Sequence, residues 1–243
     1  IDHVVFCLEG KSWRKSIYPQ YKAHRAVKVQ ALTEAEQEEN TMFWETYDTF
    51  TTFLREKTNC SVLRHENAEA DDLIARFIHL HPNDTHYIVS TDGDYAQLLA
   101  SNVMQYNGVT NELITIDGYF KDNGKPVIDK KTKEQKLLED TPDYLLFKKI
   151  IRGDAGDNVF SAFPGIREKG TKNSVGINEA FEDRSAQGYK WNNFMLQRWT
   201  DHDGVEHRVK DKYELNKTLI DLNAQPQEIK DNVDNMIRSD LRV

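Results

Sequence analysis

The stretch Tyr87-Ile88-Val89-Ser90-Thr91-Asp92-Gly93-Asp94 decides how the rest of this chain is interpreted. Its first four residues predict a short buried strand, and two carboxylates follow at i and i+2, just past the strand's carboxyl end. Side chains two residues apart in an extended segment point to the same side, so both acids can face one point in space. Parallel α/β sheets bind ligands at the carboxyl ends of their strands. Because paired carboxylates repel each other, this stretch predicts a cation site.

The composition predicts a folded chain rather than a disordered or membrane-embedded one. Among its 243 residues are 4 Trp, 10 Tyr and 11 Phe, and no apolar run approaches the ~20 residues of a transmembrane helix. Neither end resembles a signal peptide, and Cys7 and Cys60 are too few for a disulfide framework, so we expect a reducing cytoplasm. Because the chain starts at Ile1 and enters a strand almost at once, we expect its natural amino terminus further upstream.

The charges are segregated along the chain. A net charge of −8 argues by itself against nucleic acid, but residues 10–30 hold basic side chains and no acid, whereas residues 34–48 hold acids and no base. Trp13, Tyr18 and Tyr21 alternate with the basic residues, as in a surface that binds phosphates and stacks bases. A solvated basic loop explains the same composition equally well. The basic residues are Lys11, Arg14, Lys15, Lys22, Arg25 and Lys28.

A long amphipathic helix is expected after this basic stretch. Thr33 and Glu36 form a capping-box pattern at its start. Large apolar residues then recur at spacings of three and four, which favours core packing over a cofactor site. These residues are Phe43, Trp44, Tyr47, Phe50, Phe53 and Leu54.

Further acids lie next to predicted strands and helices. Glu9 ends a strand predicted over residues 4–8, and residues 60–64 predict a second strand. Glu69, Asp71 and Asp72 open a helix that continues through residues 73–78. One or two acids there would only complement the helix dipole, but three within four residues favour a metal site. A helix over residues 145–151 leads to Asp154 and Asp157, which are three apart and can share a face.

The other segments carry less chemistry. Residues 103–106 and 112–116 predict a hairpin, residues 117–141 an inserted loop or small hairpin, and residues 213–222 and 226–237 terminal helices. The glycine turn over 163–170 offers backbone N–H groups and Lys169 to a phosphate, although such turns are common.

Taken together, the acids predict a centre for two divalent ions. Converging carboxylates repel one another unless cations offset the charge. Hard oxygen ligands without Cys or His favour Mg²⁺ or Mn²⁺ over zinc, and two such ions about 4 Å apart are a common device for cleaving phosphodiesters. The acids are Glu9, Glu69, Asp71, Asp72, Asp92, Asp94, Asp154 and Asp157.

Four motifs in register resemble those of the 5′-nuclease (flap endonuclease) superfamily, and most of all bacteriophage 5′→3′ exonucleases of the T-even ribonuclease H type. The resemblance covers about residues 4–169. The motifs are residues 5–25, Glu69-Ala70-Asp71-Asp72, Ser90-Thr91-Asp92-Gly93-Asp94 and Gly153-Asp154-Ala155-Gly156-Asp157-Asn158.

The resemblance implies a fold and a domain division. The expected fold is α/β, a PIN-like core with a mostly parallel central sheet flanked by helices. The core would span residues 1–160, with a helical arch over about 11–58, and residues 161–243 would form a helical DNA-binding region. Within it, residues 161–180 match a helix–three-turn–helix that grips duplex DNA, with K⁺ expected near 163–170.

Roles for individual residues also follow from the resemblance. Glu9, Glu69, Asp71 and Asp72 would serve one ion, and Asp92, Asp94, Asp154 and Asp157 the other. Lys22 and Arg25, at the base of the arch, would stabilise charge on the phosphate and act as catalytic residues with Asp92 and Asp154. The expected DNA contacts are Lys11, Trp13, Arg14, Tyr21, Lys22, Arg25, Gly165 and Lys169.

The chain departs from the family pattern at three places. Glu9 stands where the family has Asp, and Arg167, followed by an insertion, stands where the duplex-binding hairpin has glycine. The family's first strand also carries a metal-binding Asp that nothing before Val4 supplies. We therefore expect that strand to lie outside this sequence.

The sequence thus predicts a monomeric Mg²⁺-dependent 5′→3′ exonuclease or flap endonuclease. Its substrates would be 5′ ends or flaps of DNA, with RNA–DNA hybrids as further substrates in primer removal during replication. Other replication proteins would be its partners, and a host bacterial cytoplasm its location if a phage encodes it. Two alternatives stay open: a module that binds branched DNA without cutting it, and a phosphoryl-transfer enzyme for a small substrate. The basic and aromatic stretch over 11–28 argues against the second alternative.

Overall fold

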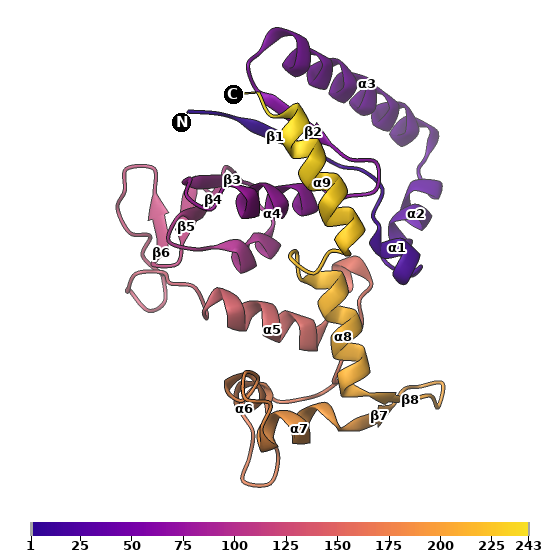
Figure 1. The fold of residues 1–243 in the computed structure, drawn as a ribbon, viewed down its shortest axis with the longest axis vertical. Coiled ribbons are helices and arrows are strands. Elements are labelled where there is room, and N and C mark those ends of the chain that lie inside the picture. The colour runs from indigo at the N-terminus through magenta and orange to yellow at the C-terminus, as the bar shows by residue number, and fades with distance from the viewer. Residues whose placement is uncertain (1, 243) are drawn as a thin grey trace. The chain divides into compact units, whose positions relative to one another are not determined.

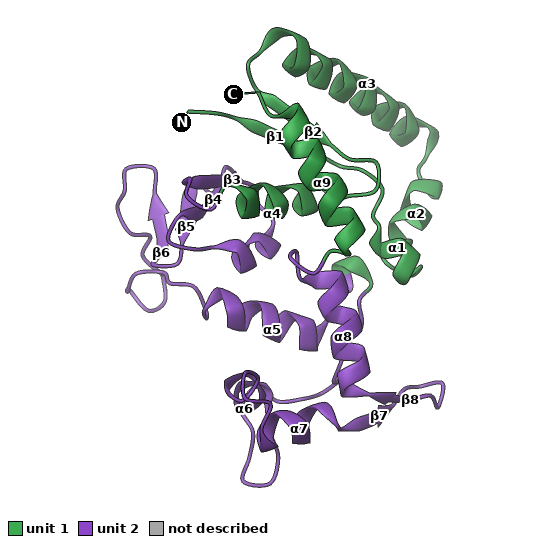
Figure 2. Cartoon of the chain, viewed as in Figure 1, with its two compact units in different colours: residues 1–81, 156–158, 225–243 green, residues 82–155, 159–224 purple. Residues whose placement is uncertain are grey.

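The chain forms two compact units. The structure is a computed structural model that describes residues 2–242 (Figure 1). Unit 1 contains residues 1–81, 156–158 and 225–243, and unit 2 contains residues 82–155 and 159–224 (Figure 2). The units therefore cross the boundary expected near residue 160: the last helix belongs with the first strands.

Unit 1 is built on a two-stranded parallel sheet. Strand β1 (Val5–Leu8) pairs with β2 (Ser61–Arg64), with Val5 opposite Ser61 and Leu8 opposite Arg64. Helices α4 (Ala70–Leu80) and α9 (Gln227–Asp240) pack on one face of the pair. Their core joins residues far apart in sequence, and its buried members are Leu63, Ala68, Leu73, Val233 and Ile237. The opposite face packs on Leu54. The strand predicted over residues 4–8 is confirmed over Val5–Leu8.

Three helices connect β1 to β2: α1 (Arg14–Ile17), α2 (Ala23–Gln30) and α3 (Glu34–Lys57). The capping box at the start of α3 is confirmed, because the Glu36 N–H bonds Thr33 Oγ1 at 3.4 Å and the Thr33 N–H bonds the Glu36 carboxylate at 2.7 Å.

The predicted core role of the α3 aromatic stripe is largely wrong. Leu54 is buried and Tyr47 packs beside it, but four large rings are between 48% and 58% exposed: Phe43, Trp44, Phe50 and Phe53. A helix of 24 residues is about 36 Å long, whereas each strand of the sheet beneath it has 4 residues and spans roughly 13 Å. The strand pair is therefore too short to cover the whole stripe.

Unit 2 contains a mixed sheet. Strand β3 (His86–Val89) pairs in parallel with β4 (Val103–Asn107). Strands β5 (Glu112–Thr115) and β6 (Gly118–Lys121) continue the sheet in antiparallel fashion. The β4–β5 hairpin is confirmed. Strand β6 lies at the start of residues 117–141, the segment expected to be an inserted loop or small hairpin. The turn between β5 and β6 needs Gly118, whose φ of +119° is strained for any other residue.

A helical layer completes unit 2. Helices α5 (Pro142–Arg152), α6 (Ile177–Glu182), α7 (Tyr189–Met195) and α8 (Val209–Ile220) share a core, with a small hairpin of β7 (Arg198–Thr200) and β8 (Glu206–Arg208) between α7 and α8. The buried members of this core include Tyr144, Phe147, Ile151, Ile177, Phe194 and Met195.

The fold is α/β, but the sheets are smaller and less parallel than expected. Over the described residues, two strand pairs are parallel and three are antiparallel. Two parallel strands must be joined by a crossover connection, whereas the short turn after β5 places β6 antiparallel beside it. No helix among residues 2–242 is long and apolar enough to span a membrane.

The packing of α4 gives a testable consequence. Leu73 is fully buried in the core of unit 1, so Leu73→Ala should lower the free energy of unfolding by about 2–5 kcal/mol. Urea denaturation measures this change. The same substitution at exposed Leu137 should change it by about 0.5 kcal/mol or less. Equal losses at the two positions would contradict the packing described here.

Candidate metal centre

The start of α4 gathers three acids. One carboxylate oxygen from each of Glu69, Asp71 and Asp72 lies within 4.8 Å of the other two. Part of the group caps the helix, because the Glu69 N–H donates to Asp72 Oδ2 at 3.1 Å. Glu9, at the end of β1, joins them by accepting the Ala70 N–H at 3.2 Å. Asp71 Oδ1 likewise accepts the Asp72 N–H at 2.8 Å. Backbone N–H groups of the first turn therefore occupy one oxygen each of Glu9, Asp71 and Asp72.

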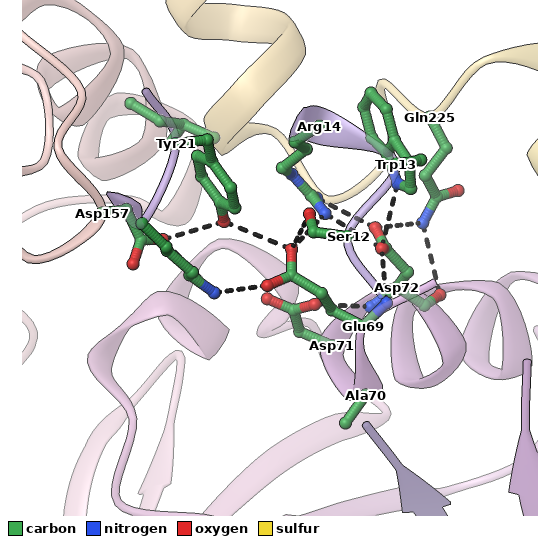
Figure 3. Close-up of polar contacts among 12 residues, drawn as sticks. Ser12, Trp13, Arg14, Tyr21, Glu69, Ala70, Asp71, Asp72, Asp157 and Gln225 are labelled. Atoms are coloured by element: carbon green, nitrogen blue, oxygen red, sulfur yellow. Dashed lines mark hydrogen bonds and ion pairs between the residues drawn. The ribbon is translucent and has the colours of Figure 1, made fainter. Parts of the chain in front are cut away.

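Asp72 is the most enclosed of these acids, with no exposed surface. Its Oδ1 accepts from Arg14 Nη2 at 2.9 Å and from Gln225 Nε2 at 3.2 Å. Its Oδ2 accepts from Arg14 Nη1 at 2.9 Å and from Trp13 Nε1 at 3.0 Å (Figure 3). Both oxygens already have donors, so Asp72 fits the role of an anchor better than that of the metal ligand expected from the sequence.

This arrangement corrects three of the expected DNA contacts. Arg14 is 1% exposed, and Trp13 and Tyr21 are 6% and 2% exposed, so none offers a face on which a base could stack. The cause is the buried charge of α4, because an uncompensated carboxylate in the interior would be costly. Arg14 neutralises Glu69 and Asp72 and lies over the Trp13 ring, 4.6 Å from its centre.

Lys22 and Arg25 bind acids rather than pointing freely into solvent. Lys22 Nζ lies 2.5 Å from Glu69 Oε1 and 3.7 Å from Asp157 Oδ2, and the lysine side chain is only 15% exposed. Arg25 Nη2 lies 2.9 Å from Asp157 Oδ1. Tyr21 OH donates to Asp157 Oδ2 at 2.9 Å (Figure 3). Asp157 thus lies with the first acid group in unit 1, whereas the sequence placed it with Asp154.

The pKa values in this group reflect its burial. Burial raises the pKa of Asp71 to about 7, and the neighbouring charge of Asp72 adds to the effect. Burial also raises the pKa of Glu9. For Glu69, burial is outweighed by Lys22 and Arg14, so its pKa lies below the usual range. Crowded carboxylates with raised pKa values are typical of functional cation sites.

A second acid group lies in unit 2. Asp92 caps the 3₁₀ segment η1 (Gly93–Leu98) by accepting the Asp94 N–H at 2.9 Å. Lys149 Nζ bonds Asp94 and lies 2.7 Å from Asp154 Oδ2. A two-way backbone bridge to Val159 holds Asp154, with both N···O distances at 2.8 Å. Burial raises the pKa of Asp94 despite Lys149.

Lys149 is the residue that the sequence reasoning missed. It lies in the amphipathic helix predicted over 145–151, where a lysine looks like an ordinary solvated residue. The only signal in the sequence is its position, five residues before Asp154. Its contact with Asp94 comes from packing of α5 against η1, which the sequence does not encode locally.

The remaining expected contacts lie on loops. Lys11, Lys169 and Gly165 are exposed, and Gly165 has the φ of +71° that a tight turn requires. The neck of the loop over 170–176 is closed by Glu179, which accepts the N–H groups of Gly170 at 2.9 Å and Gly176 at 2.8 Å. These two backbone groups are therefore already satisfied within the protein.

Comparison with known proteins identifies the family. Residues 1–131 match the model of the 5′-3′ exonuclease, N-terminal resolvase-like domain. The chain belongs to this family. A DNA polymerase I from Rhizobium leguminosarum is 26% identical over 210 residues, which cover 84% of the chain and 16% of that protein. The flap endonuclease of Escherichia phage T5 is 27% identical over 181 residues, which cover 71% of the chain and 54% of that protein. The chain therefore spans about half, or less, of the length of these relatives.

Solved structures of the phage T5 protein share the fold of this exonuclease-family chain. One, co-crystallized with metal ions, has a TM-score of 0.62 at 19% identity and covers 98% of this chain and 85% of its own. A variant of the T5 flap endonuclease, in a pseudo-enzyme-product complex with DNA and metal ions, has a TM-score of 0.62 at 18% identity and covers 100% and 85%. At these identities the likeness establishes the fold alone.

The buried ion pair predicts a large stability effect. Arg14→Gln would leave Asp72 without its bidentate partner, so the free energy of unfolding should fall by about 3–5 kcal/mol, as measured by urea denaturation. Arg25→Gln is the matched control, because the Arg25 side chain is 58% exposed and such a pair contributes about 1 kcal/mol or less. Similar small losses in both variants would mean that Arg14 is not the anchor of α4.

Asp71 predicts a pH dependence of stability. Its pKa is about 7 in the folded chain and about 3.9 when unfolded. Between these values the folded state binds more protons than the unfolded state, so the contribution of Asp71 to stability falls as the pH rises. Asp71→Asn should remove the loss of stability that Asp71 causes. The free energy of unfolding of the variant should therefore rise relative to that of the wild type between about pH 5 and about pH 8. Urea midpoints in buffer with a chelator measure the difference. A difference that does not change with pH would refute the assignment.

Proposed function

We propose that this chain is a divalent-metal-dependent 5′-nuclease that hydrolyses phosphodiester bonds near the 5′ ends or flaps of DNA. The observation that carries the proposal is the Glu69, Asp71 and Asp72 group, with one oxygen of each within 4.8 Å of the others, in a chain of the 5′-3′ exonuclease family. The T5 flap endonuclease in its complex with DNA and metal ions has the same fold, which supports the same class of substrate.

The donor set fits hard divalent ions. Every candidate ligand is a carboxylate, which favours Mg²⁺ or Mn²⁺. Glu9, Glu69 and Asp71 would hold one ion, with Asp72 anchoring them, and Asp92, Asp94 and Asp154 would hold another. When bound, such ions stabilise the charge on the attacking and leaving oxygens of an in-line displacement. The raised pKa values of Asp71 and Asp94 support the assignment, because a bound cation would offset the burial and the carboxylate repulsion that raise them.

The basic residues of α2 would position the substrate. In the structure, the cations of Lys22 and Arg25 lie against Glu69 and Asp157, beside the first acid group. A phosphate brought to this group would meet both cations, which would stabilise its developing negative charge. Lys11, Gly165 and Lys169 are exposed and would contact the DNA backbone, which carries most of the affinity in such complexes.

Several finer expectations stay predictions: RNA–DNA hybrids as substrates, primer removal, a phage origin, K⁺ near residues 163–170 and replication proteins as partners. The salt dependence of DNA binding would separate a nucleic-acid enzyme from one that acts on a small substrate, because phosphate contacts release counterions.

Cleavage of a 5′-labelled flap tests the proposal directly. With Mg²⁺, the wild-type chain should release the flap, and Asp94→Asn should lower the rate by about a hundredfold or more while keeping its affinity for the flapped duplex. Asp203→Asn is the matched control, because that acid is 73% exposed and lies outside both acid groups. It should cleave like the wild type.

Two outcomes would contradict the proposal. Cleavage at the wild-type rate by the Asp94→Asn chain would mean that the second acid group takes no part in the reaction. Tight binding of the flap without cleavage by the wild-type chain, at any Mg²⁺ concentration, would instead favour the module that binds branched DNA without cutting it.

A further inference from the structure

Each acid group contains a lysine placed between two carboxylates. In unit 2, Lys149 Nζ bonds Asp94 and lies 2.7 Å from Asp154 Oδ2. In unit 1, Lys22 Nζ lies 2.5 Å from Glu69 Oε1 and 3.7 Å from Asp157 Oδ2. A protein ammonium therefore takes up carboxylate oxygens that the proposed function assigns to an ion.

The backbone of Lys149 is fixed by its helix, whereas its long side chain can adopt other rotamers. Helix α5 is capped at Thr141, whose Oγ1 accepts the Tyr144 N–H at 3.4 Å, and Ile150 and Ile151 bury the turn that carries the lysine. The four-carbon side chain adds rotatable bonds beyond that anchor. The ammonium can thus leave the acids while its Cα stays in place.

Charge balance favours exchange with a stronger cation. Lys149 brings one positive charge to the two carboxylates that it contacts, Asp94 and Asp154, whereas a divalent ion would bring two. The ammonium and an ion cannot use the same carboxylate oxygen in the same direction. An ion that binds Asp94 Oδ1 and Asp154 Oδ2 from the side that the ammonium occupies must therefore displace the Lys149 head group.

We propose that Lys149 is a built-in counter-ion of the Asp94–Asp154 pair, which holds the acids together without metal and lowers their affinity for the divalent ion that displaces it. This role rests on the proposed function, because it presumes that the pair binds a metal. It makes Lys149 a positioning residue that sets the ion concentration at which the site fills.

Binding of Mn²⁺ tests this role without any cleavage assay. Lys149→Met keeps the length of the side chain and removes its charge. Titration of Mn²⁺ followed by electron paramagnetic resonance should show one ion bound about tenfold more tightly than in the wild type, because a competing unit charge within a few ångströms has been removed.

Lys148→Met is the matched control. Lys148 lies on the same helix and loses the same charge, but its partners are Asp140 at 2.9 Å and Glu168 at 3.4 Å, which lie outside the metal centre. The affinity for Mn²⁺ should stay within about twofold of the wild type. An equal gain in both variants would reduce the effect to general electrostatics and overturn the proposal.

Thermal unfolding separates a counter-ion from an ordinary structural ion pair. Without metal, Lys149→Met should melt below the wild type because its acids repel each other. Saturating Mn²⁺ should raise its melting temperature by more than it raises that of the wild type, since tighter binding stabilises the folded state more. If the melting temperature of Lys149→Met lies below that of the wild type by the same amount with and without Mn²⁺, Lys149 is only part of a structural ion pair. Weaker binding of Mn²⁺ by the variant would mean that Lys149 orients the ligands, which is the opposite role.

The outcomes also separate this inference from the proposed function. If the wild type binds no Mn²⁺, the metal centre and the role of Lys149 both fail. If the wild type binds Mn²⁺ and cleaves the flap while Lys149→Met binds with unchanged affinity, only the role of Lys149 fails.

Discussion

The pairing of Arg14 with Asp72 and Glu69 is the interaction on which unit 1 depends. A charged group without solvent must have a partner of opposite charge and full hydrogen bonding, and this requirement fixes three segments at once: the turn before α1, the start of α4 and Gln225, which precedes α9. The acids of the candidate metal centre are held in place by the same contacts. The enclosed pair thus gives these carboxylates a fixed geometry.

Much of the fold could be predicted because its signals are local. Short runs centred on apolar residues predicted β1, β2 and β3, and the Thr33–Glu36 box predicted the start of α3. The predictions that failed concerned which side chains are buried by tertiary packing. The α3 rings have helical spacing, but spacing does not reveal how long the sheet beneath them is. Trp13, Arg14 and Tyr21 have the composition of a DNA surface, yet the acids of α4 draw them into the interior.

The candidate site shows the same limit. The motifs identified the acids correctly as groups next to strand ends and helix starts, because those positions are set by local sequence. Their partners come from other parts of the chain: Asp157 meets Tyr21 and Arg25 across more than a hundred residues, and Lys149 meets Asp94. A lysine on an amphipathic helix carries no mark of such a contact. Charge balance in a buried group, rather than any motif, reveals that a cation must be found nearby.

The loop over 170–176 has a consequence for how this family can vary. Glu179 closes its neck, and a side chain at Gly170 or Gly176 would come within 2.4 or 2.5 Å of backbone atoms. Inside this neck, Thr171 and Ser174 form a further backbone bridge, so only the tip at Lys172 and Asn173 has no such constraint on its length. Insertions of different sizes can therefore accumulate there during evolution without a change in the helix that follows, provided that both glycines and the glutamate are kept.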